Sequence, residues 1–133
     1  MVLYDSNHIP TAAKTFTGEF YSALDNERTR ISSFYGPNAG IVWNGNPVSS
    51  GEEVSAFYAK MPPTKFDVQS YDAQPMQPDG RGSCSFLLAV SGQVRIGPES
   101  APMRGFSDTF VMKPDAKEPT RFLIATQGFR LVV

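Results

Sequence analysis

Residues Phe86-Leu-Leu-Ala-Val-Ser-Gly-Gln-Val-Arg-Ile96 give the clearest indication of how this chain folds. Phe86, Leu88 and Val90 are large and apolar, and they stand at every second position. A period of two is typical of a β-strand whose alternate side chains point into a core. Other stretches bounded by Gly, Pro and Asp clusters share this character, so four strands are expected. They cover about 65–76, 83–96, 104–113 and 120–132.

The first half of the chain has the spacing of helices instead. Apolar residues recur at steps of three and four within Ala13–Leu24 and again within Val54–Met61, which predicts two amphipathic helices. A short helix is expected over 27–34, and Ile41–Trp43 is expected to be a short strand that ends at the turn Asn44-Gly45. Helices followed by long strands predict an α+β fold, in which helices cover one face of an antiparallel sheet.

Composition limits the possible classes of protein. The 133 residues, 41% of them hydrophobic, suit one domain over 11–133 after an N-terminal arm over 1–10. The net charge is −1 and no basic run occurs, so no direct binding to nucleic acid is expected. The single cysteine, Cys84, rules out an internal disulfide. No secretory signal and no membrane-spanning stretch is apparent, so a cytosolic or nuclear location is expected.

The second face of the predicted sheet has fewer polar residues than a surface exposed to water usually has. Arg95 and Arg130 are the only charged residues near it. A flat surface with arginine, and with no lysine or glutamate at its centre, is typical of a protein interface. The alternative is a monomer whose outer surface is only modestly polar, because folded proteins expose much apolar area. The small and apolar residues of this face are Leu87, Ala89, Thr109, Val111, Ile124, Thr126 and Gly128.

Three segments of the chain carry a known family pattern. They are Ile41-Val-Trp-Asn-Gly-Asn-Pro-Val48, Phe66-Asp-Val-Gln-Ser-Tyr-Asp-Ala-Gln-Pro75 and Gly128-Phe129-Arg130. In order and spacing they resemble the nuclear transport factor 2-like family. Within it, the resemblance is strongest to the NTF-related export proteins, which are small subunits of TAP-type mRNA export receptors.

The resemblance implies a cone-shaped fold in which helices pack on a strongly curved antiparallel sheet. It implies a dimer formed face to face with the similarly folded domain of the large subunit, with Arg130 in an ion pair across the interface. No catalytic role, cofactor or metal is implied. The complex would dock on the Phe-Gly repeats of the nuclear pore and shuttle between nucleus and cytoplasm, with no direct contact with nucleic acid or membrane.

A second function within the same family is a homodimeric carrier for the GDP form of the Ran GTPase. In nuclear transport factor 2 the residue after the strand tryptophan is acidic, whereas here it is Asn44. The acidic loop of that carrier is reduced here to Glu99. Losing these carboxylates removes charge complementarity to a basic partner, so strong Ran binding is not expected.

A third possibility is a small isomerase or dehydratase, since the same fold hosts such enzymes. Asp108 stands at an inner position of its predicted strand, where Tyr58, Tyr21 and Trp43 could line the same pocket. A buried Asp beside a Tyr can act as a general base with an oxyanion donor. The alternatives are that Asp108 only hydrogen-bonds a neighbour and that Trp43 only anchors the core. The sole histidine, His8, lies in the arm, which argues against histidine chemistry.

Overall fold

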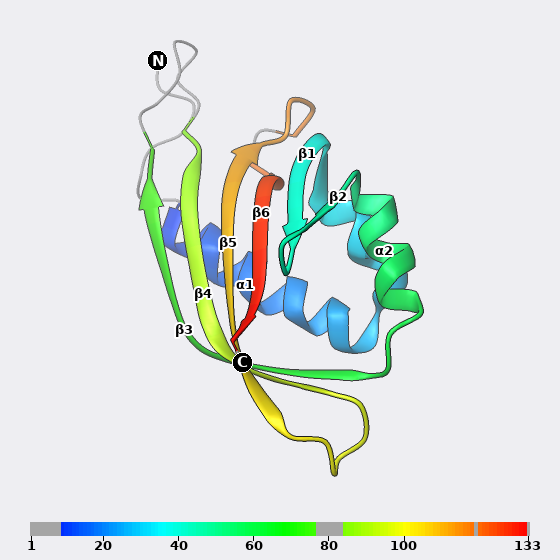
Figure 1. Ribbon diagram of the computed structural model, residues 1–133. Helices are drawn as coiled ribbons and strands as arrows, with labels where there is room; N and C mark the ends of the chain where they lie inside the picture. Colours follow the sequence, from blue (N-terminus) through cyan, green and yellow to red (C-terminus); the bar gives the residue numbers. More distant parts are fainter. Residues whose placement is uncertain (1–8, 77–83, 119, 133) are drawn as a thin grey trace.

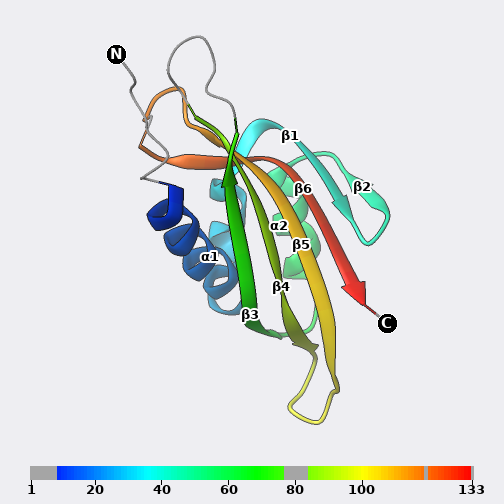
Figure 2. The ribbon, with the colours of Figure 1, turned by 90° about the vertical axis from the view of Figure 1, so that its left-hand side faces the viewer.

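The structure is a computed structural model that describes residues 9–76, 84–118 and 120–132. Six strands form one sheet in the order β2-β1-β6-β5-β4-β3, and the long strands bend around the first helix (Figure 1). All the helices lie on the same side of the sheet (Figure 2), so the predicted α+β organisation is confirmed. No helix of the described residues is long and apolar enough to cross a bilayer. The elements are α1 (Ile9–Asn26), the 3-10 helix η2 (Arg28–Phe34), β1 (Tyr35–Trp43), β2 (Asn46–Val48), α2 (Gly51–Ala59), β3 (Thr64–Pro75), β4 (Phe86–Ile96), β5 (Met103–Pro114) and β6 (Phe122–Val132).

The sequence had suggested a wholly antiparallel sheet, but one pair of strands in the structure is parallel. Strands β3 to β6 pair antiparallel in chain order, but β6 also pairs parallel with β1. The hairpin from β5 fixes the direction of β6, and β6 then lies beside β1 pointing the same way. Strand β1 is also longer than the expected Ile41–Trp43, since it begins at Tyr35 and is irregular before Gly40.

Local signals place the helix ends with small differences from expectation. Helix α1 begins at Ile9, within the expected arm over 1–10, with Pro10 in its first turn, where a missing N–H costs no helical hydrogen bond. Residues 1–8 of the predicted arm lie outside the described residues. Helix α2 is capped by Ser50, whose hydroxyl accepts a hydrogen bond of 3.2 Å from the Glu53 amide.

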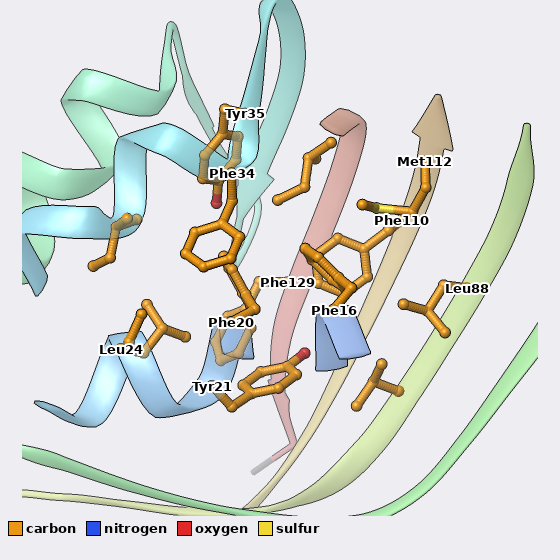
Figure 3. Packing of buried hydrophobic residues seen from close by; sticks show 14 of the residues in the cluster. Phe16, Phe20, Tyr21, Leu24, Phe34, Tyr35, Leu88, Phe110, Met112 and Phe129 are labelled. Carbon is orange, nitrogen blue, oxygen red and sulfur yellow. The ribbon is translucent and has the colours of Figure 1, made fainter. Parts of the chain in front are cut away.

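The core lies between α1, η2 and the inner face of the sheet. Phe16 on α1 stacks on Phe20 with ring centroids 5.2 Å apart and meets Phe110 of β5 edge-on at the same distance. Phe34 of η2 meets Phe20 edge-on at 5.4 Å (Figure 3). The predicted inward residues of β4 are buried, and Leu88 is fully so. Such tilted and offset ring pairs are the arrangements that aromatic side chains favour.

The prediction that Ile124 points outward is wrong, because its side chain is fully buried. Val111 pairs with Thr126, but the next residue, Met112, pairs with Ile124. Ala125 is therefore the extra residue of a β-bulge, and a bulge reverses the alternation of side chains along a strand. Strict period-two counting from the C-terminal end of β6 consequently placed Ile124 on the wrong face.

Candidate protein interface

The side of the sheet that no helix covers is called the outer face here. The register of β4, β5 and β6 aligns its residues in rows across the three strands. Because directly opposed side chains lie on the same side of a sheet, the structure brings together the predicted interface residues, with Ile124 excepted. The three rows are Leu87, Val111 and Thr126; Ala89, Thr109 and Gly128; and Ser91, Ser107 and Arg130.

Strand β1 and the strand ends add apolar residues that sequence reasoning missed. Val42 pairs with Gly128, and Met103 pairs with Arg95, so each extends the outer face. With Leu87 and Val132, these two account for four of the seven large apolar side chains that are exposed in the described part of the chain. The four are between 39% and 57% exposed. The alternation of Ile41, Val42 and Trp43 could have indicated that Val42 points outward. The pairing of its strand with β6, which places Val42 on the outer face, was not predicted.

The two arginines of the outer face have no counter-charge within the described chain. Arg130 is exposed and makes no ion pair there, and the only ion pair that this part of the chain holds joins Arg30 to Glu27. The Nε atom of Arg95 is buried and has no hydrogen-bond acceptor. The acidic residues nearest in register, Asp67 and Asp72, lie on the edge strand β3. The apolar outer face therefore presents unpaired positive charge.

The candidate catalytic residue, Asp108, belongs to a hydrogen-bonded network inside the cone. Its carboxylate accepts a 2.8 Å hydrogen bond from the Tyr21 hydroxyl and one of 3.1 Å from Nε2 of Gln127. Tyr35 in turn donates to Oε1 of Gln127. Burial raises the pKa of Asp108 to about 8, although the bonds from Tyr21 and Gln127 oppose this rise. Figure 3 shows Tyr21 and Tyr35 with their hydroxyls among the core side chains.

The other two residues of the expected pocket, Trp43 and Tyr58, form a separate pair. The indole Nε1 donates a 3.0 Å hydrogen bond to the Tyr58 hydroxyl, and the indole ring stacks on Phe129 with centroids 5.0 Å apart. Neither residue hydrogen-bonds Asp108. The structure therefore brings Trp43 together with Tyr58, whereas Asp108 is hydrogen-bonded to Gln127. Sequence reasoning missed Gln127, although it lies two residues before the inward Phe129 on the same strand and so at an inward position.

Asn44, the position that separates this chain from the Ran-carrier pattern, has a structural role. It occupies the turn after β1 with a φ of 50°, a left-handed conformation that Asn tolerates well. Its side-chain oxygen accepts a 3.3 Å hydrogen bond from the Leu131 amide. Its own amide donates to the Phe129 carbonyl at 2.7 Å. Among the described residues, no group of three or more His, Cys, Asp or Glu could hold a metal ion.

Comparison with known sequences gives a consistent result. The family model described as the nuclear transport factor 2 (NTF2) domain matches residues 12–131. NTF2-related export protein 1 of Bos taurus is 32% identical over 121 residues, which are 90% of this chain and 85% of the relative. NTF2-related export protein of Caenorhabditis elegans is 30% identical over 122 residues, again 90% and 85%. Nuclear transport factor 2 of Saccharomyces cerevisiae is 25% identical over 123 residues, 91% and 92% of the two chains.

Solved structures agree on the fold. The structure of Mtr2 has a TM-score of 0.77 at 20% identity, and the match covers 94% of this chain and 99% of the Mtr2 chain. A chain in the structure of a Sac3N peptide bound to Mex67:Mtr2 has a TM-score of 0.76 at 21% identity, and the match covers 92% of this chain and 99% of that one. A putative dehydratase from Streptomyces avermitilis has a TM-score of 0.72 at 14% identity, over 92% and 95%. The cone-shaped fold expected from the resemblance is thus confirmed, and this chain belongs to the nuclear transport factor 2 domain family.

Proposed function

We propose that this chain is the non-catalytic small subunit of a heterodimeric mRNA export receptor. Its outer face would pack on a similarly folded domain of a TAP-type large subunit and stabilise that domain. The observation that carries this proposal is the uncovered outer face itself, with Val42, Leu87 and Val132 exposed around unpaired arginine. The likeness to NTF2-related export proteins and to the solved complex of Mtr2 with Mex67 supports an export partner.

The mechanism we infer is burial of sheet against sheet. A stable complex typically covers about 800 Å² on each partner, and the three aligned rows provide a continuous surface of small, apolar and hydroxyl side chains that ends at Arg130. Arg130 would pair with a carboxylate of the partner, since arginine can donate two parallel hydrogen bonds to a carboxylate. Such a pair sets register and partner choice more than affinity, because desolvation offsets much of its attraction. Phe-Gly repeats of the nuclear pore would be bound through the complex, which shuttles between nucleus and cytoplasm.

The interior chemistry supports a binding role over an enzymatic one. Both oxygens of Asp108 accept hydrogen bonds from Tyr21 and Gln127, as expected for a buried polar group that only needs partners. The fold alone does not decide the matter, because one fold hosts many functions. The uncharged Asn44 likewise disfavours the Ran carrier, which relies on acidic residues to attract a basic partner.

The test is co-expression of this chain with the nuclear transport factor 2-like domain of the large subunit from the same genome. We expect a one-to-one complex by light scattering after size-exclusion chromatography. Arg130→Glu should abolish the complex while the free domain keeps its circular dichroism spectrum. Lys60→Glu is the matched control, since Lys60 is exposed on the helix side, and it should leave the complex intact.

Two results would contradict the proposed heterodimer, and a third would contradict only the role given to Arg130. A wild-type chain that stays monomeric at high concentration and does not bind the domain would refute the heterodimer. A stable symmetric homodimer that binds GDP-loaded Ran would favour the carrier. Unchanged affinity in Arg130→Glu would leave the heterodimer standing but remove the role given to Arg130.

A further inference from the structure

Arg95 has a buried donor with no acceptor at one end of the outer face. The residue lies on β4, opposite Lys65 of β3 and Met103 of β5. Its side chain is partly exposed, but its Nε atom is shielded from water and finds no hydrogen-bond partner in the described residues. A buried polar atom of this kind is uncommon in folded proteins, where nearly all such atoms have a partner.

The surroundings of Arg95 within the chain supply no carboxylate. Its two cross-strand neighbours are a lysine and a methionine. Asp67, which lies opposite Gln93 in the register, is the acidic residue of the outer face closest to Arg95, but no ion pair joins the two in the described part of the chain. Lys65, Arg95 and Arg130 therefore leave this end of the outer face positive.

The apolar part of the outer face reaches the same end of the sheet. Val132 lies beside Gly105, and Met103 lies beside Arg95, and both apolar side chains are exposed. A partner that covers them would also take Arg95 out of water. Covering an arginine without a counter-charge is strongly unfavourable, so a stable complex needs an acceptor there.

We propose that Arg95 is a second partner-recognition residue, and that the partner domain places a carboxylate against its guanidinium. This inference rests on the proposed function and adds to it the chemistry of the partner. It is separate from the pair at Arg130, because Arg130 lies on β6, two strands away, opposite Ser107 of β5. An Asp or Glu fits best, because a carboxylate accepts two parallel hydrogen bonds from the guanidinium and also compensates the charge that the complex takes out of water.

The test uses the partner domain that forms the complex with the wild-type chain. Arg95→Met keeps the aliphatic stem and removes the charge, Arg95→Lys keeps the charge and loses the fork, and Lys65→Met is the matched control on the neighbouring strand. Dissociation constants are measured by calorimetry over a range of sodium chloride concentrations. We expect Arg95→Met to weaken binding about tenfold or more and to flatten its salt dependence. Arg95→Lys should recover only part of the loss, and Lys65→Met should change affinity less than about fivefold.

A second measurement separates recognition from folding. Because Nε of Arg95 has no acceptor in the free chain, Arg95→Met should leave the unfolding midpoint of that chain unchanged or raised. Neutralising one acidic residue of the partner's sheet should reproduce the loss and show coupling to Arg95→Met in a double-mutant cycle. The inference is overturned if the wild type binds but Arg95→Met binds equally well, or if Arg95→Met unfolds the free chain. Absence of any wild-type complex would instead refute the proposed function.

Discussion

The charge state of Asp108 can be read from the pH dependence of unfolding, and Asp108→Asn is the substitution that isolates it. Burial raises the pKa of this carboxyl to about 8, far above its ordinary value of 3.8. Between these two values the folded chain holds a proton that the unfolded chain has lost. The free energy of unfolding therefore falls as pH rises, by about 1.4 kcal/mol per pH unit from this group alone.

The expected magnitude is large enough to measure directly. From pH 5 to pH 8 the contribution of Asp108 should decline by about 4 kcal/mol, and the loss should be complete above the folded pKa. An asparagine at this position cannot ionise, yet it still offers an oxygen to the Tyr21 hydroxyl. Asp108→Asn should thus be progressively more stable than the wild type as pH increases.

The assay is urea denaturation at pH 5, 6, 7 and 8, followed by the fluorescence of Trp43. Asp72→Asn is the control, because Asp72 is exposed on β3. Its replacement should leave the dependence of the unfolding free energy on pH as it is in the wild type. If Asp108→Asn and the wild type give parallel curves, the carboxyl ionises normally in the folded chain. The account of the buried network, in which desolvation outweighs the hydrogen bonds, would then be wrong.

Two further predictions concern residues that hold the elements together. Arg28 donates hydrogen bonds to carbonyls at the C-terminal ends of α1 and α2, so Arg28→Met should cost about 3 kcal/mol or more in urea unfolding. Arg30→Met, which loses an exposed ion pair with Glu27 and the contact of its guanidinium with the Phe34 ring at 5.7 Å, should cost less than about 2 kcal/mol, and equal costs would contradict the role of Arg28. A Cβ on Gly92 would lie 2.0 Å from the Asp67 carbonyl oxygen at the bulge of β3, so Gly92→Ala should cost about 2 kcal/mol. Gly18→Ala, with open space in the middle of α1, should stabilise by about 0.5–1 kcal/mol, and a similar loss in both variants would refute the steric explanation.

Regular alternation made much of the sheet predictable. Along β4 the inward set of Phe86, Leu88 and Val90 is buried, and Leu87 and Ala89 are exposed, as the sequence indicated. The neighbouring strands β4 and β5 share this alternation, and together they were enough to predict which residues lie on the outer face. Sequence reasoning works here because a strand that is covered on one side must sort its side chains with a period of two.

The errors occur where the backbone departs from that regularity. The bulge at Ala125 is a local backbone feature that leaves no signature in residue type, so Ile124 was assigned to the wrong face. In β1, glycine and proline before Gly40 looked like a loop, yet the segment is held as a strand by pairing with β6, which is distant in sequence. Phe57 has the spacing of the inner stripe of α2 but remains partly exposed, with its ring edge-on to the Trp43 indole at 4.8 Å.

We place the function on the outer face rather than in the interior because the residues of the two sites differ in how many existing interactions they would have to break to bind a ligand. Asp108 is buried, and both of its oxygens already accept hydrogen bonds from Tyr21 and Gln127. A substrate could reach the carboxyl group only by displacing these partners, and water could not replace the lost bonds in a buried site. Arg130 can accept a partner's carboxylate without breaking any ion pair that the described chain makes, and Arg95 would gain an acceptor that it now lacks. A partner's carboxylate at the outer face would therefore pair with Arg130 without breaking an existing ion pair and would compensate the charge of Arg95, whereas chemistry at Asp108 would have to disrupt groups that the fold has already satisfied.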